Sequence, residues 1–200
     1  MKVPAGRVKE TTAPTVAILT AAEAKVHLRI DHSTEDTYIE GLVEAAREFI
    51  ENVTGRSLIT RTYTAKLDDW PRTSVISLPF PPLIAVTSIK YTDEDGVTAT
   101  FSSSDYTVDN YNEPGRIVLA SDASWPSVKL ADINGVEIIW TAGYGAAATA
   151  LPQKLREAAY LLVGHFYENR EAVAVAQGIS VTPVPLAFWD LVMVDRVSWF

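Results

Sequence analysis

Cysteine is absent from the 200-residue chain, which excludes disulfide bonds, thiolate metal sites and cysteine nucleophiles together. Histidine is scarce, with three residues in all. His27 and His32 are close in sequence, but a metal site needs three or four convergent ligands, and the sequence offers no others beside them. His165 and Glu168 share one face of a predicted helix, where a partly buried histidine beside a carboxylate is the simpler interpretation. We therefore predict no metal ion and no cofactor.

Long apolar runs are also missing. No segment approaches the roughly eighteen apolar residues of a transmembrane helix, and the first residues lack the apolar stretch of a secretory signal. We expect no membrane span and no export, so that the protein is made in the cytoplasm of its host.

Positive charge is in the minority, with 17 lysines and arginines against 25 aspartates and glutamates and a formal net charge of −8. Nonspecific affinity for nucleic acids comes mainly from lysine and arginine, which displace counterions from the phosphates. The composition therefore excludes a general phosphate-binding surface. An acidic surface is still compatible with DNA that passes by without being bound.

The usual catalytic signatures are absent, since the sequence has no GxxxxGK[ST], HExxH, GxSxG or strand-linked GxGxxG motif. Asp93-Glu94-Asp95 lacks the spaced ligands of a calcium loop and is predicted to be a solvated hairpin tip. Asp68 and Asp69 are adjacent on an extended segment and point to opposite sides, which disfavours a glycosidase-type pair. Gly143-Tyr144-Gly145 is interpreted as a joint between a strand and a helix. We predict that the chain is not an enzyme.

The longest helical pattern runs from Ser33 to Gly55 and predicts a helix over about 34–54. Its apolar residues recur three and four positions apart and form one stripe. They are Ile39, Leu42, Val43, Ala46, Phe49, Ile50 and Val53. Gly55 is the predicted stop, because glycine reaches the left-handed conformation of a helix C-cap without steric cost. Upstream, Thr20 and Glu23 have the spacing of a capping box and predict a helix over about 20–29.

A third helix is predicted over about 151–170, with Pro152 at its first position, where a missing amide costs nothing. One apolar face of this helix carries Leu155, Ala158, Ala159, Leu162 and Phe166. A second face carries Tyr160, Val163 and Tyr167. Because a surface helix needs only one apolar face, the second is expected to contact either the β-rich region or another copy of the chain, and both alternatives stay open.

Between these helices the apolar period changes to two, as in strands with one buried face. The predicted strands are bounded by turn signals such as Asp95-Gly96 and the proline cluster at 79–82. They cover residues 59–67, 75–78, 86–91, 97–101, 106–109, 116–119 and 136–142. The last strand is the most apolar and is expected to run through the middle of the sheet. Short strands at this spacing predict a small antiparallel sandwich or barrel.

The predicted fold class is therefore α+β: a small helical core with an inserted antiparallel β-sandwich or barrel-like domain. The expected division is an N-terminal tail over 1–17, the helical core over 18–57 and 150–170, the inserted β domain over 58–149, and a C-terminal extension over 171–200. Residues 1–17 show no period and are expected to be mobile, or ordered only on a partner.

The C-terminal extension departs from these patterns. Residues 171–185 are small and punctuated by proline, as in an extended connector, and an apolar segment over 186–194 follows. Two explanations are open: the segment packs on its own domain, or it anchors in a groove on another protein, where buried aromatics carry most of the binding energy. The anchors in the second case are Phe188, Trp189, Trp199 and Phe200.

A series of short motifs, in order along residues 20–170, resembles the head-to-tail connector proteins of long-tailed phages. Each motif alone is weakly specific, and the series carries the resemblance. The motifs are Ala45-Ala46-Arg47, Ile50-Glu51, Thr54-Gly55-Arg56-Ser57-Leu58, Leu67-Asp68-Asp69-Trp70-Pro71, Leu78-Pro79, Pro81-Pro82-Leu83, Ile89-Lys90-Tyr91, Asp95-Gly96, Ala142-Gly143-Tyr144-Gly145, Leu151-Pro152, Leu155-Arg156, Ala158-Ala159 and His165-Phe166-Tyr167-Glu168-Asn169-Arg170. Residues 186–200 are longer and more aromatic than the short apolar and basic segment in which such proteins tend to end.

The resemblance implies a virion structural protein, also called an adaptor or head completion protein. Such proteins form a dodecameric ring beneath the portal at the capsid vertex and connect it to the stopper and tail, and they also occur in prophages and gene transfer agents. The implied partners are further copies of the chain, the portal protein and a stopper or tail-completion protein. Double-stranded DNA passes through the lumen without sequence-specific binding during packaging and ejection. On this hypothesis the four aromatic anchors dock on the portal, and Tyr160, Val163 and Tyr167 contact a neighbouring subunit.

A carbohydrate-binding or other accessory binding module is the alternative, motivated by five tryptophans and eight tyrosines. Such a module needs its aromatic side chains on one exposed face of a sheet. Trp70, Trp125 and Trp140 are predicted to lie on different elements, the last of them in the core, which disfavours this alternative.

Overall fold

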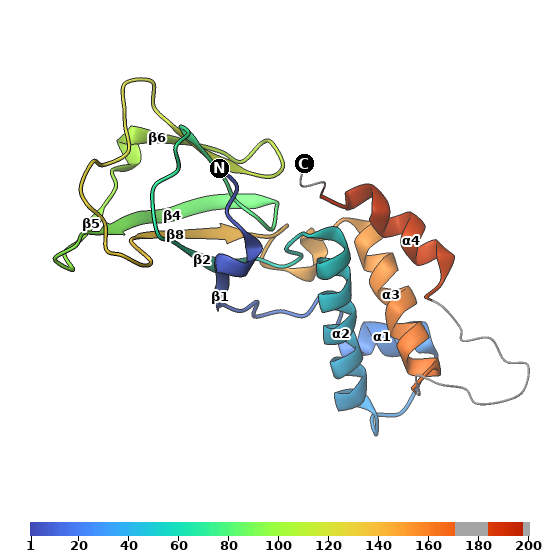
Figure 1. Ribbon diagram of the computed structural model, residues 1–200. Helices are drawn as coiled ribbons and strands as arrows, with labels where there is room; N and C mark the ends of the chain where they lie inside the picture. The colour runs from blue at the N-terminus through green and yellow to red at the C-terminus, as the bar shows by residue number, and fades with distance from the viewer. Residues whose placement is uncertain (171–183, 198–200) are drawn as a thin grey trace, which may run out of the picture. The chain divides into compact units, whose positions relative to one another are not determined.

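The computed structural model describes residues 1–170 and 184–197 (Figure 1). These residues form four α-helices and two antiparallel β-sheets, and neither sheet is a closed barrel. The α+β class is confirmed, whereas the packing of the strands as a sandwich stays a prediction. The chain divides into two compact units, a β unit of residues 1–14 and 55–144 and a helical unit of residues 15–54 and 145–200. Within the described ranges, no helix combines the length and the apolar character needed to cross a bilayer.

The larger sheet of the β unit has five strands in the order β1-β2-β8-β4-β5. Their bounds are β1 Val8–Thr12, β2 Arg61–Leu67, β4 Leu83–Thr92, β5 Thr98–Thr100 and β8 Val136–Ala142. As predicted, the most apolar strand, β8, lies in the middle, and every second side chain along it is buried. β2 follows the same alternation, so its threonines and Lys66 lie on the opposite face from Tyr63.

The smaller sheet has the order β3-β7-β6, with β3 Val75–Ser77, β6 Tyr106–Asp109 and β7 Arg116–Leu119. Side chains from both sheets enter one hydrophobic cluster, including Ile76 and Ile117 from the smaller sheet and Ile138 from the larger one. Trp140 is fully buried in this cluster, and its ring stacks on Tyr63 with 5.6 Å between centroids. Packing of alternate strand residues thus supplies the core of the β unit.

The N-terminal residues correct the prediction of a mobile or partner-ordered tail. β1 pairs antiparallel with β2 as the edge strand of the larger sheet, and Val3 is 3% exposed. The N-terminal ammonium group donates a hydrogen bond to the Val75 carbonyl at 2.6 Å. The sequence of β1, VKETT, has a single apolar residue and so no apolar alternation. Its ordering depends on a partner strand more than fifty residues away, which no local pattern reports.

The helical unit contains α1 Ala21–Leu28, α2 Asp36–Thr54, α3 Gln153–Glu168 and α4 Leu186–Val192. The predicted capping box is confirmed, since the Glu23 amide donates to Thr20 Oγ1 at 3.1 Å and the Thr20 amide donates to Glu23 Oε2 at 2.8 Å. Gly55 follows α2 with a φ of 70°, the left-handed conformation expected of a C-cap. Pro152 is the N-cap of α3 and so lies one position before the predicted one.

Short 3₁₀ helices complete the described chain at Ala5–Arg7, Ser103–Asp105, Ala148–Ala150 and Met193–Asp195. The last of these follows α4 directly. Neither it nor α4 is predicted from the sequence, where residues 186–194 read only as an apolar segment.

Candidate functional site

The histidines and acidic residues considered as metal or acid-base sites do not converge. Among the described residues, no group of three or more histidine, aspartate or glutamate side chains is placed to hold a metal ion. His32 Nδ1 is paired with Thr34 Oγ1 at 2.8 Å, and His165 lies against the ring of Phe166 at 5.9 Å between centroids. Asn169, rather than the expected Glu168, lies beside the His165 ring.

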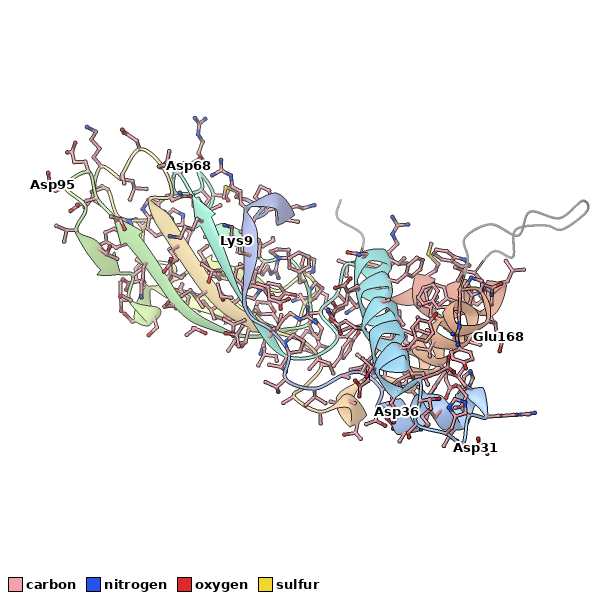
Figure 2. The ribbon with its side chains drawn as sticks, turned by 90° about the horizontal axis from the view of Figure 1, so that it is seen from below. Lys9, Asp31, Asp36, Asp68, Asp95 and Glu168 are labelled. Carbon is pink, nitrogen blue, oxygen red and sulfur yellow. The ribbon has the colours of Figure 1, made fainter. Side chains whose placement is uncertain are left out.

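Asp68 and Asp69 each have a structural partner. Asp68 forms an ion pair with Arg7 at 2.6 Å and accepts a hydrogen bond from the Asn134 amide, which lowers the pKa of its carboxyl group. Asp69 instead accepts from the amide of Trp70 at 2.8 Å. Figure 2 labels Asp68 and Asp95, which lie at separate places on the β unit. Asp68 and Asp69 are therefore engaged separately and do not act as a pair of carboxylates facing a common substrate.

The C-terminal segment packs on its own helical unit through α4. Phe188 and Val192, four residues apart on one helix face, are both fully buried. The Phe188 ring meets Phe49 of α2 edge-on at 5.6 Å, and Trp189 meets Phe49 at 6.2 Å. Of the two explanations for this segment, packing on its own unit is the one that holds for Phe188. Trp199 and Phe200 lie outside the described residues, so their predicted role as anchors is untested.

The other side of α4 keeps apolar surface exposed. Leu186 is 83% exposed and Met193 47%, and these residues, seven apart, lie on the same side of the helix axis. Val194 in the following 3₁₀ turn is 80% exposed. The segment is held at its far end by an ion pair from Lys154 Nζ to Asp195 Oδ1 at 2.8 Å. Exposed apolar side chains on an ordered helix are available to a partner without further folding.

The second apolar face of α3 contacts other helices of the same unit, an outcome that neither predicted alternative included. Val163 is fully buried. Tyr160 lies against His27 of α1 at 5.2 Å, and Tyr167 lies 6.2 Å from the ring of Tyr38 in α2. Tyr160 and Tyr167 are each half-buried and keep some exposed surface. Contact of these two tyrosines with a neighbouring subunit stays a prediction. Val163 cannot contact a neighbouring subunit in this conformation, because its side chain is fully buried.

Tyr167 also belongs to a charged cluster at the end of α3. Its hydroxyl donates to the Glu35 carboxylate, which in turn pairs with Arg170 at 2.6 Å. The Arg170 guanidinium lies 4.6 Å from the ring of Tyr38 and 4.7 Å from that of Tyr167. The hydrogen bond from Tyr167 lowers the pKa of Glu35 and raises that of Tyr167 itself. These contacts tie the start of α2 to the end of α3.

The tryptophans are less scattered than predicted. Trp70 and Trp125 stack almost in parallel, with ring centroids 4.9 Å apart and 11° between the planes. The Trp125 indole donates to the Thr73 carbonyl at 3.0 Å, and Phe101 packs against both rings. Each indole therefore covers one face of the other, which leaves no open pair of ring faces for a sugar. Trp140 is in the core, as predicted.

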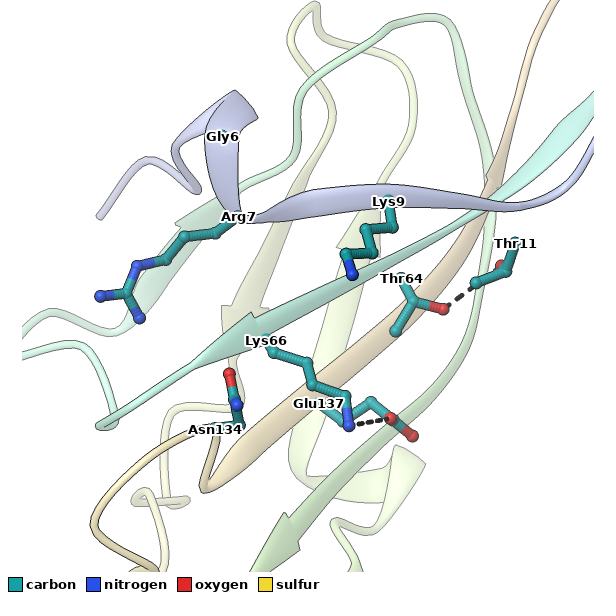
Figure 3. A pocket seen from close by; sticks show the side chains of 8 residues that line it. All are labelled: Gly6, Arg7, Lys9, Thr11, Thr64, Lys66, Asn134 and Glu137. Atoms are coloured by element: carbon teal, nitrogen blue, oxygen red, sulfur yellow. Dashed lines mark hydrogen bonds and ion pairs between the residues drawn. The ribbon is translucent and has the colours of Figure 1, made fainter.

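The β unit carries a groove on its larger sheet, seen from close by in Figure 3, and most of the residues that line it are polar or charged. We call it the β1 groove. It has a volume of about 570 Å³ and is lined by Gly6, Arg7, Lys9, Thr11, Thr64, Lys66, Asn134 and Glu137. Lys66 is paired with Glu137 at 3.4 Å. For Lys9, no ion pair is found within the described part of the chain. No local sequence pattern indicated Arg7 and Lys9 as groove residues, because β1 was not predicted.

Comparison with known proteins assigns this architecture to a family. The family model for the head completion protein matches residues 17–185. The chain is similar to one described as "Neck of empty GTA particle computed with C6 symmetry", with a TM-score of 0.79, 27% identity and 96% of each chain covered. It is also similar to chains from the "Virion of native gene transfer agent (GTA) particle" and the "Neck of native GTA particle computed with C12 symmetry", with TM-scores of 0.79 and 0.76, 28% identity and 96% coverage of each chain in both cases.

No curated protein sequence matches the chain. The family model nevertheless spans most of both units, from before α1 to the residue that precedes α4. The structural likeness covers nearly the whole of each chain, so it includes the β unit as well as the helices. The chain therefore belongs to the head completion protein family.

Proposed function

We propose that this chain is a structural protein of the neck of a phage-like particle, where twelve copies form a ring adaptor between the portal and the stopper or tail. The observation that carries the proposal is the family match over residues 17–185. The likeness to chains from gene transfer agent necks supports the location. The sixfold and twelvefold symmetries named for those necks support a ring, and the twelvefold one supports a dodecamer.

The charge of the chain supports a passage for DNA through this ring. With a formal net charge of −8, the protein lacks the excess of lysine and arginine that neutralises successive phosphates. A lumen formed by such subunits repels the duplex and lets it move without sequence-specific binding.

The C-terminal segment is the part of the chain that we propose to dock on the portal. Phe188 acts within the subunit, because it is fully buried against α2 and holds α4 in place. The exposed residues Leu186, Met193 and Val194 present apolar surface beside it, and Trp189 is half-buried. We include Trp199 and Phe200, at the end of the sequence, among the residues proposed to contact the portal.

The test is attachment of the purified protein to its portal ring, imaged by electron microscopy as a stacked ring. Deleting residues 186–200 is a poor probe, because it would also uncover Phe49 in the helical core. The sharper variant is Leu186→Asp combined with Val194→Asp, which alters side chains that are 83% and 80% exposed. We expect this variant to fold normally and to lose attachment to the portal.

The control is Val26→Asp, which places one aspartate at an 81% exposed position of α1. The control should attach like the wild type. Stacked rings formed equally well by the double variant would remove the C-terminal segment from the proposal. A wild-type protein that forms no ring with the portal would contradict the adaptor function itself.

A further inference from the structure

The larger sheet has two open edges with different chemistry. β1 forms one edge and β5 the other, with β2, β8 and β4 between them. A closed ring of identical subunits uses heterologous contacts, in which one patch of each copy meets a different patch of the next. Two unlike edges of one sheet are suited to such a contact.

The β1 edge carries the β1 groove, whose cations lie on the solvent-facing side of the sheet. Lys9 is paired in register with Thr64, and Lys66 with Glu137. Lys90 is also paired in register with Glu137, so this glutamate has a lysine on each side. The exposed Lys9 and Lys66 give the groove a positive end in a chain whose net charge is −8.

The opposite edge ends in an acidic hairpin tip, Asp93-Glu94-Asp95, between β4 and β5. The Asp93 carboxylate accepts hydrogen bonds from the amides of Asp95 and Val97 at 3.1 and 2.8 Å, which orders the turn. Glu94 is paired with Lys129 at 2.5 Å in an exposed position. The Asp95 side chain is exposed and has no partner within the described residues. The tip is thus a preformed loop that presents a carboxylate to solvent.

The groove and the tip lie on opposite edges of the sheet and at different levels along the strands. Lys9 pairs with Thr64, which is level with Ile139 and Ser88, whereas the tip follows Thr92 at the end of β4. Leu67 and Tyr91 are both paired in register with Val136, so the end of β2, the end of β4 and the start of β8 coincide. Four strand spacings of about 4.8 Å separate the two edge strands, or about 19 Å. Figure 2 shows Asp95 and Lys9 apart from one another on the β unit. One copy therefore has no means to pair its own tip with its own groove.

We propose that the acidic tip of one copy docks in the β1 groove of the next copy around the ring, with Asp95 facing Lys9. This inference rests on the ring of the proposed function. Because Lys9 is level with Ser88 and the tip follows Thr92, the β5 edge of one copy lies beside the β1 edge of the next with a shift along the strands that brings the tip to the groove. The same contact repeated around an axis closes a ring.

A second copy suits the groove better than a nucleic acid does. Duplex DNA is bound by several lysines and arginines that neutralise successive phosphates. Here Arg7 and Lys66 are already paired with Asp68 and Glu137, which leaves Lys9 as the lysine or arginine of the groove lining without an ion pair in the described chain. The groove volume of about 570 Å³ matches a short loop rather than a double helix.

The test begins with charge reversal, read out by ring formation on the portal. Lys9→Glu with Lys66→Glu should reduce the assembled fraction at least tenfold, and Asp95→Lys with Glu94→Lys should do the same. A chain that carries all four changes should recover assembly, because the attraction is restored with opposite signs. Arg72→Glu, at an exposed position outside the groove, is the matched control and should assemble normally. Circular dichroism of each variant should equal that of the wild type.

Cross-linking then tests the contact itself, since the natural chain has no cysteine. A chain with Lys9→Cys and Asp95→Cys, assembled on the portal and treated with a short bismaleimide, should give a ladder of covalent oligomers. A chain with Arg72→Cys and Asp95→Cys should stay monomeric in a denaturing gel.

The outcomes separate this inference from the function on which it rests. Rings that form normally without a Lys9–Asp95 ladder would overturn the contact and leave the adaptor ring intact. Reversal variants that assemble normally but yield particles with less DNA would overturn it in favour of a nucleic acid contact. A wild-type chain that joins no ring would overturn both proposals.

Discussion

Replacing Phe188 with alanine tests whether α4 is part of the folded helical unit. Phe188 is fully buried, and its ring lies 5.6 Å from Phe49 and 5.2 Å from Trp189. Alanine at this position leaves a cavity between α4 and α2, and neighbouring side chains relax into it only partly. The substitution therefore removes both apolar burial and packing from the helical unit.

The expected loss is about 3 kcal/mol of unfolding free energy, the lower end of the range for phenylalanine-to-alanine changes in protein cores. The loss has an upper bound, because α4 can detach while the remaining helices stay folded. Burial of Phe188 and Val192 contributes roughly 1.5–3 kcal/mol each, so detachment forfeits about 3–6 kcal/mol. The cost of the cavity, about 3 kcal/mol, therefore does not exceed the cost of detaching α4, about 3–6 kcal/mol.

The assay is urea unfolding of the purified monomer, followed by far-ultraviolet circular dichroism and by tryptophan fluorescence. The two probes are needed because a chain of two compact units need not unfold in one step. Leu186→Ala, at an 83% exposed position of the same helix, is the control and should change stability by no more than about 0.5 kcal/mol. If Phe188→Ala is as mild as this control, α4 does not belong to the core, and the interpretation of the whole segment as a free docking arm returns.

Four further substitutions address other parts of the chain. Gly143→Ala should destabilise by about 1–3 kcal/mol or more, because φ is +133° there and a Cβ would lie 2.6 Å from backbone atoms. Gly41→Ala, with open space around it in α2, should instead stabilise by about 0.4–1 kcal/mol. Arg47→Ala should cost about 3 kcal/mol, since it removes a buried cation paired with glutamates of its own helix. Asp109→Asn should lower stability above pH 3.8, with the deficit disappearing toward pH 2, because hydrogen bonds from Asn112 lower the pKa of Asp109 to about 2 in the folded state.

Urea unfolding measures the first three changes, and a series of unfolding curves between pH 7 and about pH 2 measures the last. Equal stability of the two glycine variants would contradict the strained conformation at Gly143. An Arg47→Ala chain as stable as the wild type would show that the ion pairs between Arg47 and the glutamates of α2 do not contribute to the free energy of unfolding. A deficit of Asp109→Asn that stays constant down to about pH 2 would contradict the lowered pKa.

Elements with strong local signals were predictable. Thr20 and Glu23 define the start of α1 by a contact over three residues, and Gly55 ends α2 through its own backbone freedom. The alternation in β2 and β8 likewise follows from which side of one strand faces the core. In each case the deciding interaction lies within a single turn or strand.

The candidate site was predictable only in part. Phe188 and Trp189 were identified as aromatic residues that need a partner, and the structure finds that partner for both rings in Phe49. Trp70 and Trp125, predicted to lie apart, stack on one another. Both contacts join residues more than fifty positions apart. The local sequence around each aromatic residue does not indicate which distant residue it will contact.

The sequence alone determined the helical and strand periods, the acidic balance and the absence of cysteine chemistry, and its motifs resemble one family. Only the tertiary structure decided that residues 8–12 form an edge strand, that α4 packs on α3 and α2, and that side chains on both apolar faces of α3 contact helices of the same subunit. The physical reason is that periodicity reports which side of an element is apolar but not what covers it. The partner that covers a face is chosen by packing between segments distant in the chain, where side-chain shape and strand edges determine the fit.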